Sequence, residues 1–228
     1  MERLLKEKNN QYVVMMRGIT ASGKSTTAAF IKHFFTERGV EVAKHSTDEF
    51  FLTEEGKYLF DPSKLSQYHH LNLEAFREDV KKGTEIVICD NTNLIPWQTE
   101  PYTQVAREYD YKIIFVDLPV RSLQEHIEAQ KVTEARPDAH KIPETAILSM
   151  IRDYNNYKEL LDLKSPINPK KHRRYVWCPV SKKNVLSDEV CKHFDLDYLI
   201  SPTKGTAEEK IQYVVDIFSK LFFSQNLH

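Results

Sequence analysis

The chain has 228 residues, of which 41% are hydrophobic and 29% charged, and its formal net charge is −1. This balance is typical of a globular protein and gives no global field that would attract nucleic acid or an anionic membrane. The polar first ten residues do not resemble a signal peptide, no stretch is apolar enough to span a bilayer, and the three cysteines form no disulfide framework. The sequence therefore predicts a cytoplasmic protein without a membrane partner.

The first predicted elements surround a glycine-containing loop. Residues 12–16 are an apolar run typical of a buried strand, and residues 26–38 show helical periodicity. Between them, GITASGKS (residues 18–25) fits G-x-x-x-x-G-K-[ST], a phosphate-binding loop. The alternative is a chance match in an ordinary strand-turn-helix corner. We expect the nucleotide-binding residues to be Gly18, Ala21, Ser22, Gly23, Lys24, Ser25 and Thr26.

The chemistry of phosphate binding explains this spacing. Glycines let backbone N–H groups turn inward, and the positive end of the following helix dipole points at the same phosphates. Lys24 is expected to bridge the β- and γ-phosphates of ATP or GTP, and the Ser25 hydroxyl to ligate Mg²⁺. The loop alone does not identify the acceptor of the phosphate.

A carboxylate follows the second predicted strand. Residues 41–45 alternate like a strand and lead into STDEFF (residues 46–51), at the sheet edge where open α/β folds bind ligands. Asp48 is positioned to accept the proton of an attacking hydroxyl. Alternatively, Asp48 is an ordinary helix N-cap.

A second carboxylate follows the third predicted strand. Residues 52–63 form a turn-rich connection, residues 64–82 a helix, and residues 85–89 an apolar strand that ends in DNTN (residues 90–93). Asp90 is at the Walker-B position and is expected to bind Mg²⁺. The predicted substrate-binding residues are Asp48, Asp90, Asn91, Thr92 and Asn93. The alternative for DNTN is a polar turn with local hydrogen bonds.

A lid is predicted after the fourth strand. Residues 96–109 form a helix, residues 112–117 a strand, and residues 121–133 and 144–163 two helices around the basic loop 135–143. We expect a lid around 121–145, with Arg136 stabilising the transferred phosphoryl group. Arg121, Lys131 and Lys141 are weaker candidates, and a solvated surface loop is the alternative.

The remaining residues predict a C-terminal extension, 164–228, packed on the core formed by residues 1–163. Residues 164–173 are typical of a linker, and the basic run Lys170–Arg174 lies beside Tyr175 and Trp177. Such a cluster binds phosphate backbone and stacks bases, or is simply a solvated charge run. Residues 174–180 and 196–200 predict strands, and residues 208–223 an amphipathic helix.

The blocks GITASGKS, HSTDEFF and ICDNTN, followed by a basic loop that ends in KIP, resemble P-loop kinases related to phage polynucleotide kinase and to zeta toxins. The resemblance covers about residues 11–160. It implies an α/β P-loop NTPase fold, a parallel sheet sandwiched by helices with a helical lid. It also implies ATP-dependent phosphoryl transfer to a hydroxyl, in which Lys24 and Ser25 bind phosphate and Mg²⁺, Asp48 is the base, Asp90 and Asn93 lie near metal and acceptor, and Arg136 is the lid arginine.

One position departs from this family. Phe51 stands where the phage enzyme type has an arginine that grips an acceptor phosphate. The preferred acceptor is the 5′-hydroxyl of a polynucleotide or nucleotide-like molecule, which makes nucleic acid a candidate partner. A small-molecule kinase acting on a sugar or nucleotide sugar is the alternative enzyme. An ATP-dependent binding or switch module is the alternative of another class. The sequence gives no indication of the oligomeric state.

Overall fold

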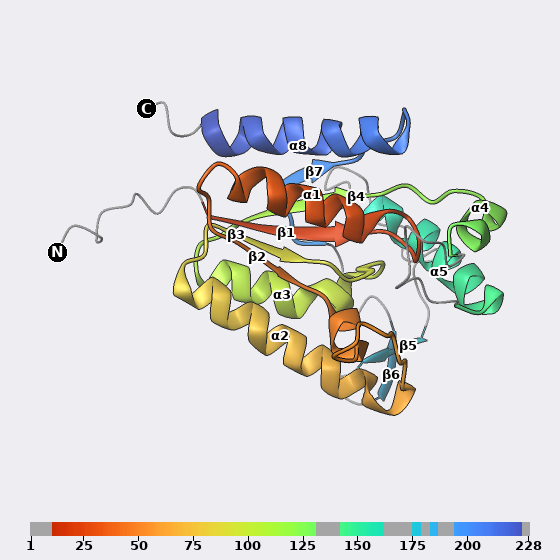
Figure 1. Ribbon diagram of the computed structural model, residues 1–228. Helices are drawn as coiled ribbons and strands as arrows, with labels where there is room; N and C mark the ends of the chain where they lie inside the picture. Colours follow the sequence, from red (N-terminus) through yellow and green to blue (C-terminus); the bar gives the residue numbers. More distant parts are fainter. Residues whose placement is uncertain (1–10, 131–141, 162–174, 179–182, 187–193, 225–228) are drawn as a thin grey trace.

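The computed structural model describes residues 11–130, 142–161, 175–178, 183–186 and 194–224. Its centre is a five-stranded parallel sheet in the order β2-β3-β1-β4-β7 (Figure 1). The strands are β1 (Tyr12–Arg17), β2 (Val42–His45), β3 (Ile86–Cys89), β4 (Lys112–Asp117) and β7 (Tyr198–Ile200). Strands β1, β3 and β4 are almost wholly apolar because both faces of a parallel sheet are covered.

Helices cover both faces of the sheet. On one face lie α1 (Lys24–Thr36) and α8 (Ala207–Ser224), and on the other α2 (Leu65–Lys82) and α3 (Pro96–Glu108) (Figure 1). Alternate residues of β1 enter the two cores, with Val13 and Met15 on the α2–α3 side and Val14 and Met16 on the α1–α8 side. The predicted fold class, a parallel sheet sandwiched by helices, is confirmed.

The loops at the carboxyl ends of the strands lie together at one end of the sheet. The arrows of Figure 1 point towards this end, where the phosphate loop, α4 (Leu123–Glu128) and α5 (Glu144–Tyr157) are found. Short 3-10 turns lie at Thr47–Phe51, Pro62–Lys64 and Lys158–Leu161. The polar segments that follow β1, β2 and β3 therefore lie at the same end of the sheet.

The helix after β4 is shorter than the 121–133 predicted from the sequence. Ser122 is its N-cap and exchanges hydrogen bonds with Glu125 in a capping box, so the helix begins at Leu123 and ends at Glu128. The residue before the cap, Arg121, remains outside the helix. An N-cap residue has an extended backbone, so the helix cannot begin before Ser122. The spacing of apolar side chains does not reveal this start.

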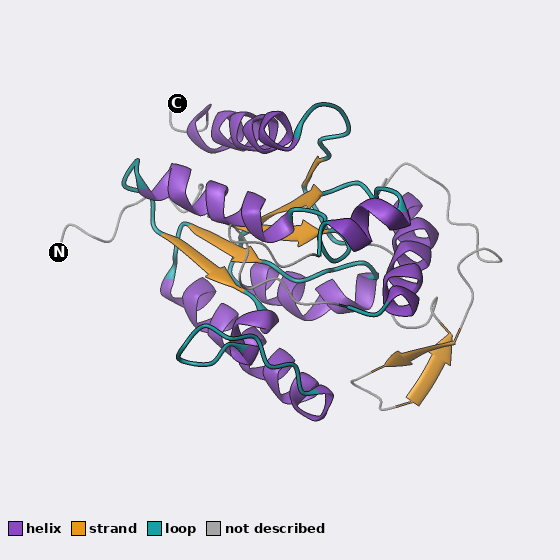
Figure 2. Cartoon of the chain, turned by 45° about the vertical axis from the view of Figure 1, so that its right-hand side comes forward, coloured by secondary structure: helices purple, strands orange, loops and turns teal. Residues whose placement is uncertain are grey.

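The C-terminal residues contribute to the same sheet and core. Strand β7 pairs in parallel with β4, and α8 packs on α1 through Val214, Val215, Phe218 and Phe222. Burial of a large apolar side chain contributes about 1.5–3 kcal/mol, so this helix is a substantial part of the fold. A separate antiparallel ribbon is formed by β5 (Tyr175–Cys178) and β6 (Lys183–Leu186), as Figure 2 shows. The sequence predicted β5 but not β6.

No helix within the described ranges is long and apolar enough to cross a membrane.

Candidate nucleotide and acceptor site

The phosphate loop leaves β1 at Gly18 and enters α1 after Gly23. Gly23 has φ 96°, a left-handed conformation that favours glycine. A side chain at Gly18 would lie 2.7 Å from the Ser22 hydroxyl and 3.2 Å from the Leu118 carbonyl oxygen. The Ser22 hydroxyl is buried and has no hydrogen-bond partner among the described residues. The loop is therefore tight and keeps at least one polar group unsatisfied, as expected of an anion-binding nest.

Lys24 folds back over this loop, with Nζ donating a 3.0 Å hydrogen bond to the Ile19 carbonyl oxygen. Burial lowers the pKa of Lys24, while the nearby carboxylates of Asp90 and Asp48 raise it. The structure therefore brings together three residues that the sequence placed after three different strands. A cation flanked by two carboxylates is suited to receive a polyphosphate together with a divalent metal.

Asp90 is buried and carries the chemistry of a metal ligand. Burial raises its pKa, Lys24 and Lys44 lower it, and the Ser25 hydroxyl also lowers it from close by. Neither carboxylate oxygen has a hydrogen-bond partner among the described residues, and Lys44 Nζ remains 3.9 Å from Oδ2. Buried carboxylate oxygens are normally hydrogen-bonded or bind a metal. The orphaned oxygens thus fit the predicted Mg²⁺ site.

No cluster of three or more His, Cys, Asp or Glu side chains that could hold a metal exists within the described ranges. Mg²⁺ at nucleotide sites is held by one or two protein groups, substrate phosphates and water. Ser25 and Asp90 are the two protein groups that fit this role.

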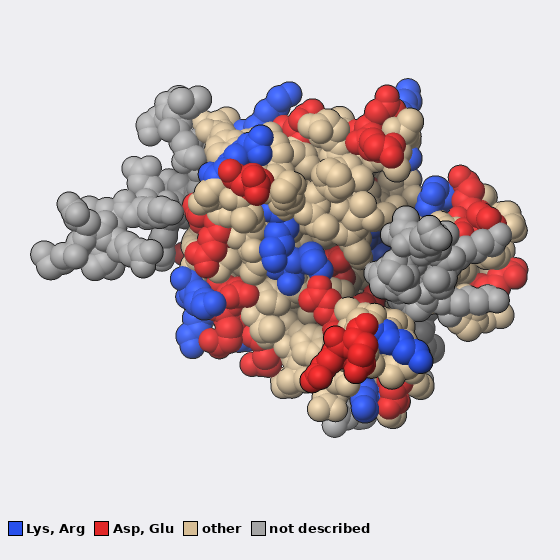
Figure 3. Space-filling view, in the orientation of Figure 1, with Lys and Arg blue, Asp and Glu red and all other residues tan. Residues whose placement is uncertain are grey.

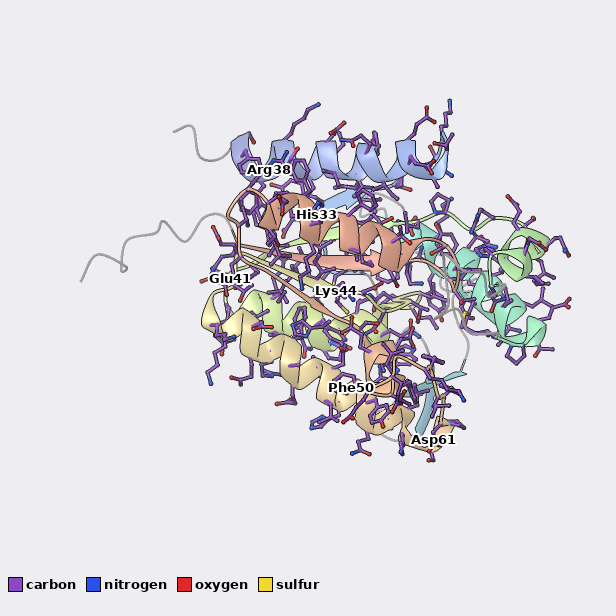
Figure 4. The ribbon with its side chains drawn as sticks, viewed as in Figure 1. His33, Arg38, Glu41, Lys44, Phe50 and Asp61 are labelled. Carbon is purple, nitrogen blue, oxygen red and sulfur yellow. The ribbon has the colours of Figure 1, made fainter. Side chains whose placement is uncertain are left out.

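Asp48 lies on the 3-10 turn Thr47–Phe51 after β2, exposed to solvent. The Tyr58 hydroxyl donates a 3.3 Å hydrogen bond to its Oδ1. Lys44, on β2, forms an ion pair with Glu49 of the same turn. Figure 4 labels Lys44 on its strand and Phe50 on the turn that follows. Asp48 is therefore open to solvent and is held by the Tyr58 hydroxyl.

The turn is also tied to the polar residues after β3. Asn91 Oδ1 accepts a 3.0 Å hydrogen bond from Thr47 N, and its Nδ2 donates to the Tyr102 hydroxyl at 3.3 Å. The Thr47 hydroxyl contacts His69 Nδ1 at 3.0 Å. Burial lowers the pKa of His69, and Asp48 raises it. Asn91 thus connects the two carboxylate-bearing segments directly.

Thr92 and Asn93 hold the base of the phosphate loop. The Thr92 carbonyl oxygen accepts a 3.0 Å hydrogen bond from Gly18 N, and Asn93 Nδ2 donates to the Met16 carbonyl oxygen at 2.8 Å. Asn93 has φ 50° and is buried. The substrate-binding role expected of Asn91, Thr92 and Asn93 stays a prediction, since the structure gives each of them an architectural bond.

Sequence reasoning missed a buried network beneath the loop. Arg17 Nη1 donates to Asp117 Oδ1 at 2.7 Å, and the Tyr154 hydroxyl donates to Asp117 Oδ2 at 2.7 Å. The Arg17 guanidinium also lies over the Tyr154 ring, 4.2 Å from its centroid. A usable signal was present, because an arginine in an apolar strand directly before a phosphate loop must find a buried anion.

Arg121 also reaches the phosphate loop, donating to the Ala21 carbonyl oxygen. Its backbone N–H donates to His126 Nε2 at 3.1 Å. Of the predicted basic lid residues, Arg121 is thus placed beside the nucleotide-binding loop. Arg136, Lys131, Lys141 and the Lys170–Arg174 cluster lie outside the described residues.

Comparison with known proteins agrees with this geometry. The model of the family AAA_33, described as an AAA domain, matches residues 13–156. Human NEDD4-binding protein 2 is 28% identical over 169 residues, which cover 74% of this chain but only 9% of the human protein. A structure of the Pnkp1/Rnl/Hen1 RNA repair complex aligns with a TM-score of 0.53 at 16% identity, covering 93% of this chain and 78% of the other. A fungal RNA kinase aligns with a TM-score of 0.49 at 14% identity, covering 93% and 87%.

The family match covers more than half of the chain. It also covers nearly all of residues 11–160, the range over which the sequence resembles P-loop kinases. That resemblance is confirmed. The chain belongs to the AAA_33 family of AAA domains, and its fold is the P-loop NTPase fold predicted from the sequence.

Proposed function

We propose that the protein is an ATP-dependent kinase that transfers the γ-phosphoryl group of ATP to a hydroxyl of an acceptor. The observation that carries the proposal is that Lys24, Asp48 and Asp90 follow the carboxyl ends of β1, β2 and β3, three strands that are neighbours in the sheet. Lys24 alone would suit any nucleotide-binding protein. The second carboxylate, exposed at the edge of the site, has no role in nucleotide binding and suits an attacking hydroxyl.

In this proposal the loop N–H groups and Lys24 bind the β- and γ-phosphates. Asp90 and Ser25 would hold Mg²⁺, which supplies charge neutralisation at the phosphates when it is bound. Lys24 remains the chain's own cation at the transferred group, because its hydrogen bond to the Ile19 carbonyl oxygen already directs Nζ over the loop.

Asp48 then acts on the acceptor. Its carboxylate takes the proton of the hydroxyl as the hydroxyl oxygen bonds to the γ-phosphorus, and the bond between the γ-phosphorus and the β,γ-bridging oxygen breaks to release ADP. The Tyr58 hydroxyl donates to Asp48 Oδ1 and holds the carboxylate in place. General base catalysis of this kind contributes about 10²–10⁴-fold in rate. Arg136 remains the proposed lid cation, and Arg121 is the described arginine that contacts the loop.

For the acceptor we propose the 5′-hydroxyl of a polynucleotide or nucleotide-like molecule. The basic cluster Lys170–Arg174 beside Tyr175 and Trp177 favours this acceptor, since cations bind phosphate backbone and aromatic rings stack on bases. A sugar or nucleotide-sugar kinase is the second candidate, which Phe51 and the near-neutral net charge favour. Figure 3 shows acidic and basic side chains interspersed on the visible face, without a single-sign field.

The test offers ATP labelled on its γ-phosphate with Mg²⁺ to 5′-hydroxyl RNA and DNA oligonucleotides and, separately, to a pool of sugars and nucleotide sugars. Lys24→Ala serves as the blank. Label on the oligonucleotide, with a KM that rises with salt, supports the polynucleotide acceptor. Label confined to a small molecule, with a salt-independent KM, supports the metabolite kinase. ATP binding without any transfer would replace the kinase by a nucleotide-dependent switch module.

A further inference from the structure

A short hairpin follows the Asp48 turn. Leu52 and Tyr58 form an antiparallel bridge, Thr53 N donates to the Lys57 carbonyl oxygen at 2.9 Å, and Leu59 N donates to the Phe51 carbonyl oxygen at 2.8 Å. The hairpin is therefore an ordered structure rather than a loose connection. The residues after it, up to Leu65 at the start of α2, complete the segment 47–65.

Five aromatic rings of this segment and α2 pack into one cluster, which we call the aromatic platform. The Phe51 ring is buried at its centre, with its centroid 5.0 Å from that of Phe60, 4.8 Å from Tyr68 and 5.8 Å from Tyr58. The Phe50 ring stacks on Tyr68 at 5.6 Å. Phe51, which replaces a charged residue of related kinases, thus has a clear physical role as the support of the other rings.

The platform keeps much apolar surface in water. Phe60 is 55% exposed, and three leucines of the same segment are exposed too: Leu59 at 52%, Leu52 at 42% and Leu65 at 36%. Single exposed apolar residues need no explanation, but several within one short segment, one of them packed on the buried Phe51 ring, are typical of a binding surface. Figure 2 draws this segment as an extended loop beside α2, at the edge of the molecule.

The platform is continuous with the proposed general base. Tyr58, whose ring packs on Phe51, donates its hydroxyl hydrogen to Asp48. One side chain, Tyr58, thus links Asp48 to the platform. The segment 48–65 carries five acidic residues (Asp48, Glu49, Glu54, Glu55 and Asp61) and two lysines. Such a surface repels phosphate and suits an uncharged aromatic group.

We propose that the base of the acceptor's 5′-terminal nucleoside stacks on the aromatic platform, with Phe60 as its exposed ring. The inference rests on the proposed function and makes the acceptor a base-bearing, single-stranded end. A 5′-hydroxyl terminus fits the charge of the site because its terminal nucleoside carries no 5′-phosphate. A stacked base also replaces the phosphate grip that Phe51 cannot provide, since base–aromatic stacking is tolerant of sequence and needs no cation.

The experiment compares an oligonucleotide that has a normal 5′-terminal nucleoside with one that has an abasic 5′-terminal residue. Binding is measured by fluorescence anisotropy without ATP, and transfer by γ-phosphate label. Removal of the base should weaken binding to the wild-type protein about tenfold, the scale of one stacked base. Phe60→Ala should weaken binding of the normal oligonucleotide by a similar factor and abolish the difference between the two oligonucleotides. Salt should change both affinities but not their ratio.

Two further variants make the result specific. Phe60→Trp keeps an aromatic surface and should retain the discrimination against the abasic end. Phe30→Ala removes a phenylalanine on α1 that is equally exposed, at 53%, and should bind both oligonucleotides as the wild type does. Because Phe60 is mostly exposed, its removal leaves the buried Phe51 core in place, and a melting curve checks this.

The outcomes separate the two proposals. Equal affinity of the wild type for normal and abasic ends, no effect of Phe60→Ala, or no oligonucleotide binding would each overturn the platform assignment, even if transfer occurs. Base-dependent binding that Phe60→Ala abolishes would support it even if no label were transferred, and in that case the proposed kinase activity alone fails. If the platform instead binds another protein, the wild type should bind normal and abasic ends equally and Phe60→Ala should have no effect.

Discussion

The Arg17 guanidinium and the Asp117 carboxylate form a 2.7 Å ion pair beneath the phosphate loop, with side-chain exposed fractions of 0% and 3%. Arg17 Nη2 adds hydrogen bonds to the carbonyl oxygens of Leu94 at 3.2 Å and Tyr154 at 3.1 Å. The pair therefore joins β1, β4, the segment before α3 and the helix α5. The loop residue Gly18 comes directly after Arg17, so this network anchors the end of β1 from which the phosphate loop leaves.

Arg17→Met should destabilise the protein strongly. Removal of one partner leaves the buried Asp117 charge uncompensated, which typically costs about 3–5 kcal/mol. Tyr154→Phe removes only one hydrogen bond to Asp117 and should cost about 1–3 kcal/mol. Urea unfolding measures both effects. The matched control is Arg77→Met, which breaks the exposed pair with Glu108 and should cost no more than about 1 kcal/mol. A loss for Arg17→Met no larger than this control would contradict the assigned role.

Asp48→Asn should abolish transfer while nucleotide binding remains. The amide keeps the size of the carboxylate but cannot take the acceptor's proton, so the transfer rate should fall about 10²–10⁴-fold. Nucleotide affinity, measured by calorimetry, should change little because Asp48 lies at the acceptor edge. Glu37→Gln, at the exposed end of α1, is the charge-matched control and should behave as the wild type. Unchanged transfer by Asp48→Asn would remove the assigned base.

Asp90→Asn should stabilise the metal-free protein although it removes activity. Burial raises the Asp90 pKa above its ordinary value of 3.8, so the ionised form is disfavoured in the folded state. At pH values above 3.8 the folded state therefore binds more protons than the unfolded state. The free energy of unfolding decreases as the pH rises through the pKa that Asp90 has in the folded state. The melting temperature of the variant should therefore exceed that of the wild type at neutral pH and approach it in acid. Added Mg²⁺ with ATP should stabilise the wild type more than the variant. A lower neutral-pH melting temperature of the variant would contradict this account.

His126 should make the protein sensitive to mild acid. Its ring is fully buried against the phosphate loop, and burial, followed by the nearby Arg121 cation, lowers its pKa from the ordinary 6.5. Below that pH the unfolded chain takes up a proton that the folded ring does not, so the free energy of unfolding decreases as pH falls. Burial lowers the pKa of His45 and His69 as well and acts in the same direction.

Urea unfolding at about pH 7.5 and about pH 5.5, on either side of the histidine range, tests this prediction. His126→Gln should reduce the loss of stability between the two pH values. His33→Gln, an exposed position on α1 labelled in Figure 4, is the control and should leave that loss unchanged. An identical pH dependence for His126→Gln and the wild type would contradict the assigned contribution.

Local pattern was enough to predict most of the described core. The apolar strands, the loop at residues 18–25 and the helical stripes depend on residues that are neighbours in sequence, so their periodicity identifies them. Asp48 and Asp90 could be placed at one site because parallel strands present their carboxyl ends at the same edge. The Ser122 cap and the β6 strand were missed because a boundary or a short edge strand depends on particular backbone angles and partners.

The amino-acid sequence alone thus predicts the kinds of elements, the phosphate loop and the two carboxylates that follow strands. The folded chain adds the pairing of β7 with β4, the burial of Phe51 under an exposed ring, and the contact of Arg17 with Asp117, one hundred positions away along the chain. Helix and strand periodicity depends on residues that are neighbours in sequence, whereas the partner of a strand, ring or charge depends on the packing and charge compensation of the complete core.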